Sequence, residues 1–403
     1  MKNNKWLIIL FLIMGVLLSS LKETSAFEFS GYIETDGRVF TNNPLYSNLK
    51  EESFSISIKP EFYHEWENGS SFTFVPFLRY DSADSERSNF DVEEALFLYI
   101  EEDQSFELRM GMGVVFWGVT ESQHLVDIIN QINLAEFPDG EDKLGQPMVN
   151  IALLRDWGTL DFFILPYFRE RIFPGLHTPL RFDPVIEMDQ ARYESNDEER
   201  HVDYALRYSN SIGNWDFGIY HFYGTNREPT FLLEFDSMSR PYLVPYYELI
   251  HQTGIDVQLT LNSWLWKWES IYRVGQGEED FFAYTAGFEY TLYGVFETGM
   301  DIGLVAEYMY DDRDNEATTP FNNDVMLGTR IACNDVSSTQ ALLGVIKDVE
   351  DSSTVFTVNA SRRFGNNWKM ELDAYIFHDT SENDYIYSAR NGDFVQVSMF
   401  WYF

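Results

Sequence analysis

Alternation of apolar and polar residues recurs along most of this chain. In residues 53–66 the apolar side chains fall mainly on even positions, and Ser, Lys and Glu fall on most of the odd positions between them. The same alternation marks residues 106–116, 202–208, 255–261, 300–310 and 368–376. Because successive side chains of a strand point to opposite faces, each segment predicts a strand with one apolar face and one polar face.

Short turns and longer polar connections alternate between the predicted strands. The short turns lie at residues 67–70, 102–105, 155–158, 210–214, 261–263, 293–298, 334–338 and 365–367, and the longer connections lie near 41–52, 81–90, 118–147, 171–199, 225–248, 275–280, 311–323, 347–352 and 379–392. Short turns at one end and long loops at the other are typical of outer-membrane barrels. We therefore predict an all-β fold, a transmembrane antiparallel up-and-down β-barrel of about 18 strands, with about 16 as the alternative, in a single domain over 27–403.

Aromatic residues make up 17% of the chain and gather at the ends of the predicted strands, as in residues 264–268 and 400–403. In a membrane barrel such residues form girdles at the two interfaces. A secreted β-sandwich also has alternating strands, but it would not place aromatic residues at nearly every strand end. The distribution favours the barrel.

The N-terminus has the features of a signal peptide over residues 1–26. Lys2 and Lys5 precede an apolar run over 6–18, and the small residues 24–26 offer a cleavage site. An uncleaved transmembrane anchor would need about 20 apolar residues. No second apolar run approaches the length of a transmembrane helix. We predict export, and location in the outer membrane of a Gram-negative bacterium.

Acidic residues dominate the charge of the chain. The formal net charge is −37, and removal of residues 1–26, which hold three Lys and one Glu, changes it to −39. Acidic clusters lie in the predicted connections at 139–142, 194–200, 276–280 and 311–316. Such a surface disfavours nucleic acid and attracts cations at low ionic strength. Cys333 is single, so the chain has neither an internal disulfide nor a cysteine metal site.

The connection at 118–147 has a pattern of its own. Leu125, Ile128, Ile129 and Ile132 are spaced as one face of a helix. Thr120 and Gln123 fit a capping box, and a proline follows at 138. We predict a short helix over about 121–136 within this loop, with its apolar face against the mouth or interior of the barrel. The loop would then act as a plug or constriction.

Period two also predicts which charged residues face the lumen. With the apolar faces outward, the inward residues are nearly balanced in charge: Lys59, Arg79, Arg109, Arg169, Arg207, Lys267, Arg273, Arg330 and Lys369, with Glu61, Glu107, Asp203, Asp256, Glu269, Asp301, Glu307, Glu371 and Asp373. We predict that Arg109 and Arg169 line the constriction opposite Asp127 and Asn130. The remaining residues of the predicted pore are Glu107, Trp117, Arg171 and Arg207.

Two stretches resemble known families. Residues 393–403 alternate and end in Phe403, and they resemble the last strand of Gram-negative outer-membrane barrels. That resemblance implies recognition of Phe403 by the barrel-assembly machinery. Over about 106–135, residues 109–111, Trp117-Gly118 and residues 127–130 resemble the pattern of a strand, Trp-Gly and a long loop in poorly characterised porin-like families. The chain departs from that pattern at Gln131, where Pro is usual, and at Gly113, where a polar residue is common.

The function predicted from these features is a porin-like channel for passive diffusion of small hydrophilic solutes, constricted by the loop 118–147. The alternative is a closed or gated barrel, acting as a dedicated ligand uptake protein or a surface scaffold, with the loops 118–147 and 171–199 as a lid. Uptake of an apolar compound would need an apolar patch inside the barrel. The candidates for it are Phe97, Tyr99, Phe163 and Leu165.

Enzymatic and metal motifs are not found in the sequence. There is no His-Glu-x-x-His and no Gly-x-Ser-x-Gly, and no serine is marked as a partner for His251 or His378, as a phospholipase on the barrel exterior would require. We predict no enzyme activity, no cofactor and no specific metal site. Asp312, Asp314 and Glu316 alternate like calcium ligands, but Ala317 stands where an EF-hand has Gly. We interpret them as a solvated acidic loop, with loose Ca²⁺ binding as the alternative. The remaining predicted partners are outer-membrane lipid and lipopolysaccharide, and the oligomeric state stays open.

Overall fold

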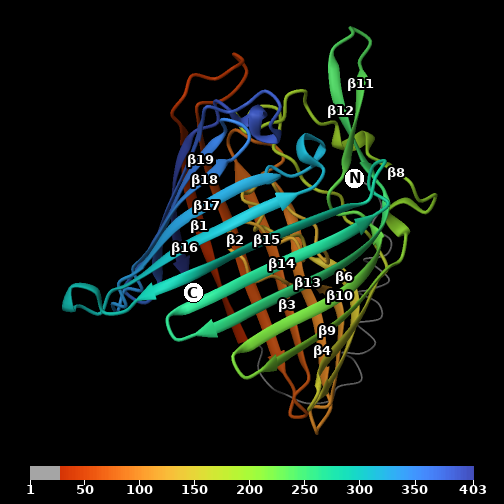
Figure 1. Ribbon diagram of the computed structural model, residues 1–403, viewed down its shortest axis with the longest axis vertical. Coiled ribbons are helices and arrows are strands. Elements are labelled where there is room, and N and C mark those ends of the chain that lie inside the picture. Colours follow the sequence, from red (N-terminus) through yellow and green to blue (C-terminus); the bar gives the residue numbers. More distant parts are fainter. Residues whose placement is uncertain (1–27) are drawn as a thin grey trace.

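The computed structural model describes residues 28–403, which form a closed barrel of 18 strands (Figure 1). The signal peptide predicted for residues 1–26 lies outside the described residues. The barrel strands are β1 (Glu28–Phe40), β2 (Glu52–Glu65), β3 (Ser71–Asp81), β4 (Phe90–Ile100), β5 (Phe106–Gly113), β6 (Gln146–Arg155), β7 (Gly158–Leu165), β9 (Asp203–Ile212), β10 (Trp215–Thr225), β13 (Leu249–Leu261), β14 (Trp264–Val274), β15 (Phe281–Leu292), β16 (Asp301–Asp311), β17 (Asn323–Ala332), β18 (Gln340–Asp348), β19 (Thr354–Phe364), β20 (Trp368–His378) and β21 (Phe394–Tyr402).

Each barrel strand pairs antiparallel with the next barrel strand along the chain, and β21 pairs with β1 to close the sheet. The up-and-down topology and the strand number predicted from the alternation are therefore confirmed. Closure leaves no free sheet edge, so every strand has hydrogen-bonding partners on both sides.

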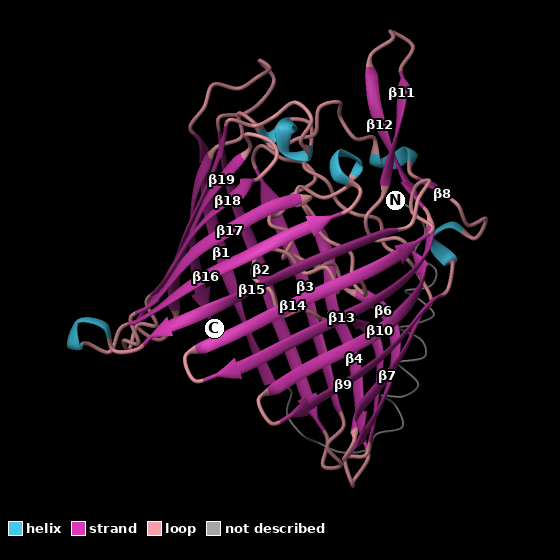
Figure 2. Cartoon of the chain, in the orientation of Figure 1, coloured by secondary structure: helices cyan, strands magenta, loops and turns pink. Residues whose placement is uncertain are grey.

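The connections differ in length at the two ends of the barrel, as predicted. Short turns join β2 to β3 and β4 to β5, whereas long connections join β1 to β2 and β7 to β9. Above the long-connection end stands a small sheet of β8 (Arg192–Tyr193), β11 (Thr230–Phe235) and β12 (Pro241–Tyr247) (Figure 2). The helical elements of residues 28–403 are short 3₁₀ turns: η1 (Met188–Gln190), η2 (Glu198–Arg200), η3 (Val295–Glu297), η4 (Asp314–Glu316) and η5 (Tyr385–Ala389).

The two faces of the strands differ in chemistry. In β2, Phe54 and Ile56 are 54% and 44% exposed on the outside, whereas Ser55 and Ser57 are buried on the inside. Tryptophans at 264, 266 and 268 of β14 are likewise exposed on the outer surface. An apolar outer face with aromatic residues is the surface of a barrel that spans a lipid bilayer.

None of the helices within residues 28–403 is long and apolar enough to cross a membrane.

The final strand follows the predicted alternation. In β21, Val395, Val397 and Trp401 are exposed on the outer face, and Gln396 and Ser398 are buried on the inner face. Phe403 follows the strand, and its ring centroid lies 5.2 Å from that of Phe29. The last residue is therefore placed at the barrel wall beside β1. Its recognition by the assembly machinery stays a prediction.

Candidate functional site

The connection between β5 and β6, residues 114–145, lies inside the barrel, and we call it the lumen loop. On one side of the barrel, the Glu136 carboxylate lies 3.2 Å from Nε of Arg79 on β3. On the other side, the Val119 N–H donates to Oε1 of Glu269 on β14 over 2.6 Å. Since β3 and β14 are far apart in the ring of strands, the loop crosses the lumen.

The helix predicted for residues 121–136 is wrong. The lumen loop contains bends, turns and isolated bridges, and no helix. Thr120 and Gln123, predicted as a capping box, do contact each other: the Thr120 hydroxyl donates to the Gln123 carbonyl over 2.5 Å. This contact closes a single turn that does not continue as a helix.

Carboxylates of the barrel wall explain why no helix forms. Oε2 of Glu269 accepts from the Val126 N–H over 3.3 Å, in addition to the bond from Val119. In a helix over 121–136, that N–H of Val126 would instead have bonded to the carbonyl of Ser122. Oε2 of Glu307 on β16 accepts from the N–H of Ser122 over 2.8 Å. Tertiary contacts thus outweigh the local pattern.

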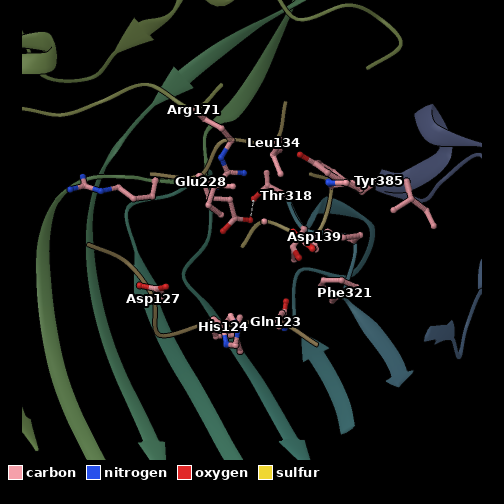
Figure 3. A pocket seen from close by; sticks show the side chains of 18 of the residues that line it. Gln123, His124, Asp127, Leu134, Asp139, Arg171, Glu228, Thr318, Phe321 and Tyr385 are labelled. Atoms are coloured by element: carbon pink, nitrogen blue, oxygen red, sulfur yellow. Dashed lines mark hydrogen bonds between the residues drawn. The ribbon is translucent and has the colours of Figure 1, made fainter. Parts of the chain in front are cut away.

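A glycine is required where the loop meets this wall. Gly118 has a φ of +144°, and a Cβ there would lie 2.8 Å from Nδ1 of His124 and 3.1 Å from Oε1 of Glu269. His124 and Gln123 lie near the floor of a cavity (Figure 3). The Trp-Gly pair of the sequence therefore has a steric reason, because a side chain at 118 would push the loop off Glu269.

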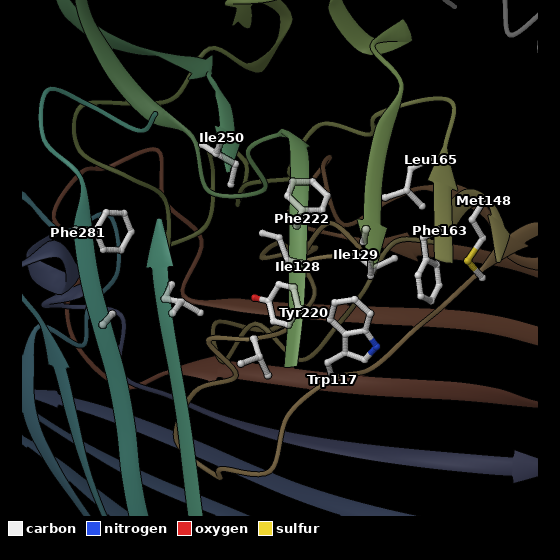
Figure 4. Close-up of a cluster of buried hydrophobic side chains, with 14 residues drawn as sticks. Trp117, Ile128, Ile129, Met148, Phe163, Leu165, Tyr220, Phe222, Ile250 and Phe281 are labelled. Carbon is white, nitrogen blue, oxygen red and sulfur yellow. The ribbon is translucent and has the colours of Figure 1, made fainter. Parts of the chain in front are cut away.

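Apolar side chains of the lumen loop pack on one part of the wall. Ile128 and Ile129 are 3% and 0% exposed, while Leu125 and Ile132 are partly buried. The burial predicted for this stripe is confirmed, although its backbone is not helical. We call the inward side of β6–β15 the covered wall (Figure 4). The apolar loop residues and the apolar residues of the covered wall form one buried cluster. The wall residues in that cluster include Met148, Phe163, Leu165, Tyr220, Phe222, Ile250, Ile271 and Phe281.

A buried ionic cluster holds the opposite end of the loop. Besides Arg79, Nε of Arg87 lies 3.5 Å from the Glu136 carboxylate, and Nη2 of Arg38 donates to the Glu136 carbonyl over 2.9 Å. Asp36 of β1 pairs with both Arg79 and Arg87, at 2.6 and 3.0 Å. Burial raises the pKa of Glu136 to about 7, against the attraction of the two arginines.

Two further ion pairs lie within the loop. Nε2 of His124 lies 2.9 Å from Glu141. Burial alone would lower the pKa of His124, but the ion pair with Glu141 and the nearby carboxylate of Glu269 raise it to about 10. Nζ of Lys143 lies 3.4 Å from Asp127. Burial raises the pKa of Asp127 to about 6, although Lys143 and His124 oppose the rise.

Of the predicted pore residues, Asn130 holds the base of the loop together. Its Oδ1 accepts from the Val115 N–H over 2.8 Å, and its Nδ2 donates to the carbonyls of Gly113 and Leu144 over 2.9 and 2.8 Å. Because all of these groups are buried or nearly so, Asn130 joins the two ends of the lumen loop and does not face open space.

Arg109 and Glu107 lie near the short-turn end of β5. Nη2 of Arg109 donates to Glu107 over 2.5 Å, and Nη1 donates to Oδ1 of Asn150 on β6 over 2.9 Å. About a third of the Arg109 side chain is exposed, at 36%. Because Asn150 is fully buried, the pair lies on the inner face of the barrel, and its role in a constriction stays a prediction.

Trp117 of the lumen loop packs against the covered wall beside Arg207 of β9. Arg207 lies over the Trp117 ring at 4.9 Å from its centroid, and its Nη2 pairs with Asp256 at 2.7 Å. The Trp117 ring also packs edge-on against Phe163, at 5.7 Å between centroids. Both residues therefore help to hold the lumen loop against the covered wall.

Arg169 and Arg171 follow β7, which ends at Leu165, so the prediction that Arg169 is part of the strand is wrong. Nη2 of Arg169 pairs with Asp91 at 2.9 Å, and its Nη1 donates to the Gly145 carbonyl over 2.9 Å. Nε of Arg171 donates to Oε1 of Gln131 over 3.2 Å. Both arginines thus contact the C-terminal side of the lumen loop or its partners.

The predicted pore residues do not form one cluster. Within residues 28–403, neither Arg109 nor Arg169 makes a hydrogen bond or ion pair with Asp127 or Asn130. Sequence reasoning placed Glu269 and Glu307 in the lumen but assigned them no role, and it did not single out Glu136, His124 or Lys143. The alternation along the strands predicts that Glu269 and Glu307 face the lumen, whereas no signal in the sequence predicts which atoms of the lumen loop they bind.

Opposite the covered wall, a cavity of about 520 Å³ lies between the lumen loop and the inward side of β16–β20. We call this cavity the open cavity and the inward side of β16–β20 the open wall. Ala332, Gln340 and Ser361, beside the short turns, and Asp324 and Ser353, beside the long connections, all line it. Its lining contains seven acidic residues against Arg330, Lys369 and His124, so this part of the lumen is acidic. The strand residues that were predicted to face inward are balanced here, Arg330 and Lys369 with Glu371 and Asp373, and the excess comes from Asp324 and the connections.

No group of three or more His, Cys, Asp and Glu side chains within residues 28–403 is arranged to hold a metal ion. On the outer surface, Nδ1 of His251 lies 3.4 Å from Nε2 of His221, and Nδ1 of His221 lies 2.9 Å from the Thr253 hydroxyl. Among the described residues, no serine forms a hydrogen bond with His251.

No family model matches the chain, and no curated protein matches it. Among solved structures, it is similar to a mutant porin of Rh. blastica, with 11% identity and a TM-score of 0.46 over 94% of this chain and 100% of that one. Another mutant of the same porin has 12% identity and a TM-score of 0.45, with the same coverage. The outer-membrane expressed OmpT of Vibrio cholerae has 9% identity and a TM-score of 0.46 over 95% of this chain and 99% of that one. The barrel assignment rests on the strand pairing given above.

Proposed function

We propose that this protein is an outer-membrane channel through which small hydrophilic solutes diffuse passively, with the lumen loop as its constriction. The observation that carries the proposal is the open cavity. Its lining runs from residues beside the short turns to residues beside the long connections, along one side of the loop. Export by residues 1–26, assembly through Phe403 and a surrounding of outer-membrane lipid and lipopolysaccharide belong to the same proposal.

Charge in the open cavity supports preference for cations. Asp139 and Glu141 of the loop face the same space as Glu371 and Asp373 of β20. Carboxylates on both sides of a narrow path attract cations and repel anions, as rings of charged side chains do in selective pores. We expect moderate cation selectivity that weakens as the salt concentration increases.

A gated barrel that takes up one ligand is the second candidate. The observation that favours it is the fixation of the lumen loop at both ends, by Glu269 of β14 and Glu307 of β16 on one side of the barrel and by Arg79 and Arg87 on the other side. Buried contacts to charged groups are costly to break, by about 1.5–3 kcal/mol each. In this case the path would open only when a ligand or partner moves the loop.

Single-channel conductance of the refolded mature chain in a planar bilayer separates the two functions. The wild-type chain is compared with a variant in which a Gly/Ser linker replaces residues 119–142, and reversal potentials are measured under a salt gradient. A channel predicts steady, cation-selective conductance that increases several-fold in the linker variant. A Gly/Ser replacement of the turn 334–338, outside the lumen, is the control and should leave conductance unchanged.

The other outcomes decide between the alternatives. Conductance in the linker variant alone would favour the gated barrel, because the loop would then be a plug. Absence of conductance in both proteins, with folding verified by the heat-dependent gel shift of barrels, would reject the open channel and leave a closed scaffold.

A further inference from the structure

A second cavity, of about 260 Å³, lies on the long-connection side of the lumen loop (Figure 3). We call it the vestibule cavity. Residues of the loop form one side of it, and the connections that follow β7, β10, β16 and β20 form the other sides. Much of its wall is apolar, with Leu134 from the loop and Phe182, Phe321 and Ile386 from the connections. A wall of this kind binds the hydrocarbon part of a solute.

The charged groups of the vestibule cavity are paired with two exceptions. Five ion pairs account for the others: His124 with Glu141, Lys143 with Asp127, Arg227 with Asp203, Arg273 with Glu228, and Arg313 with Asp311. Burial would raise the pKa of Glu228, but Arg273 and Arg313, with a smaller contribution from the charge of Arg171, lower it to about 2, so this carboxylate is ionised and neutralised. Within the described residues, the two lining groups that form no ion pair are Arg171 and Asp139.

Arg171 is held so that the end of its side chain remains available. Its backbone N–H donates to the Tyr247 hydroxyl over 3.0 Å, and its Nε donates to Gln131. Within residues 28–403, its two terminal nitrogens have no hydrogen-bond partner. A fixed guanidinium with two free terminal NH₂ groups is suited to bind a carboxylate in bidentate fashion.

Asp139 offers the complementary charge. Its Oδ1 accepts from the Glu141 N–H over 3.1 Å, and its Oδ2 accepts from the Tyr375 hydroxyl over 3.3 Å. These bonds orient the carboxylate but do not neutralise it. Asp139 is exposed to the lumen and lines both the vestibule cavity and the open cavity.

We propose that the vestibule cavity binds a zwitterionic solute with an apolar body, whose carboxylate meets Arg171 and whose ammonium group meets Asp139. An organic anion would satisfy Arg171 but leave its other end facing an unpaired carboxylate. An alkylammonium ion would leave Arg171 unpaired. Only a solute with both charges neutralises both groups, while its hydrocarbon part covers the apolar wall. The solute class of the channel follows from this, so the inference rests on the proposed function.

Binding to the full mature chain in detergent micelles tests the proposal by isothermal titration calorimetry. The probes are γ-aminobutyrate, ε-aminocaproate and ω-aminocaprylate, compared with the alkanoates and alkylammonium ions of the same lengths. We expect one of the amino acids to bind about tenfold more tightly than its two single-charge analogues, the effect of one added charge-assisted hydrogen bond. The best chain length would report the spacing of Arg171 and Asp139.

Variants of the two groups complete the test. Arg171→Gln and Asp139→Asn should each weaken binding of the best amino acid about tenfold. Arg171→Lys, which keeps the charge but loses the bidentate geometry, should bind more weakly than the wild type and more tightly than Arg171→Gln. Asp139→Asn should no longer discriminate against the alkanoate. Arg240→Gln, at an exposed arginine paired with Asp236 outside the cavity, is the control and should bind as the wild type does. The heat-dependent gel shift verifies folding of every variant.

The possible results separate this inference from the channel itself. Equal binding of an alkanoate and its amino acid, unaffected by Asp139→Asn, would overturn the zwitterion in favour of an organic anion. Conductance without binding of any probe would overturn the vestibule site and leave the channel. Binding without conductance would leave the site and reject the channel.

Discussion

The covered wall and the open wall are built from strands of one pattern, yet they face the lumen differently. Inward positions of the covered wall hold Phe163, Leu165 and Ile250, which the loop residues Ile128 and Ile129 shield from water. The inward positions of the open wall mix acidic, basic and polar residues with apolar ones, and the loop leaves a cavity there. In one barrel, the apolar inward residues of the covered wall pack against the loop, and the inward residues of the open wall line the space that remains.

The largest effect should come from detaching the loop from the covered wall. Ile129→Asp places a charge in a site that is fully buried among apolar side chains. Loss of this packing and burial of an unpaired charge cost several kcal/mol, about 3–5. We expect a several-fold larger and noisier single-channel conductance. Val336→Asp, in an exposed short turn, is the matched control. A conductance equal to that of the wild type would mean that the apolar contact does not seat the loop.

A second variant separates the polar contacts of the covered wall from the apolar ones. Glu269→Ala removes the acceptor for the N–H groups of Val119, Thr120 and Val126. We expect a loss of at least about 3 kcal/mol in unfolding free energy, since three hydrogen bonds to a charged group are lost and each contributes about 1.5–3 kcal/mol. Amide hydrogen exchange at residues 119–126 should increase strongly.

Glu371→Ala on the open wall is the control for this variant. Glu371 pairs with Lys369 and is partly exposed, so its removal should change stability by less than about 1 kcal/mol. Equal effects of the two substitutions would remove the distinction between the walls.

The difference between the walls also explains how much could be predicted from the sequence. Strands, turns and the strand number follow from the alternation of apolar and polar residues, because successive residues of a barrel strand face the lipid and the lumen in turn. The same alternation predicts Phe163 and Leu165 as inward apolar residues, and both belong to the buried cluster that packs against the lumen loop. Local patterning was therefore sufficient for the wall.

The loop could not be predicted in this way. The spacing of Ile128 and Ile129 correctly predicts burial, but the Val126 N–H bonds to Glu269, which is distant in sequence, and this bond decides against a helix. The pairing of Glu136 with Arg79 is of the same kind. Gln131 accepts a hydrogen bond from Arg171, and no pattern in the sequence indicates that contact.

A smaller effect should sharpen the role of the open wall. Asp373→Asn removes a carboxylate that lines the open cavity and accepts from Asn359 over 3.0 Å. We expect the cation-to-anion permeability ratio to decrease about twofold, with little change in stability, because the group acts through its field in water. Asp335→Asn, in a short turn outside the cavity, should leave the ratio unchanged. The measurement is the reversal potential under a salt gradient, and an unaffected ratio for Asp373→Asn would show that ions pass elsewhere.

The smallest effect concerns the buried carboxylate of Asp127, whose charge is not stabilised by any hydrogen bond within the described residues. Asp127 is nearly fully buried, neither of its carboxylate oxygens has a hydrogen-bond donor within the described residues, and Lys143 lies 3.4 Å away. Its pKa, raised to about 6 by burial, means that the seated loop favours the protonated form. The stability of the wild type should therefore decrease as pH rises from about 4 to about 6 and stay lower above that.

Neutralising both partners tests this without leaving Lys143 unpaired. In Asp127→Asn/Lys143→Met, the free energy of unfolding relative to the wild type should increase between pH 4 and pH 7, by about 1–2 kcal/mol. Comparison of the two proteins at each pH cancels the titration of all other groups. Asp127→Asn alone should be less stable than the double variant, because it leaves a buried ammonium without a partner. A difference in unfolding free energy that is constant with pH would show that Asp127 titrates as it does in water. Water would then reach this part of the interface between the loop and the covered wall, although the apolar contacts suggest that it is excluded.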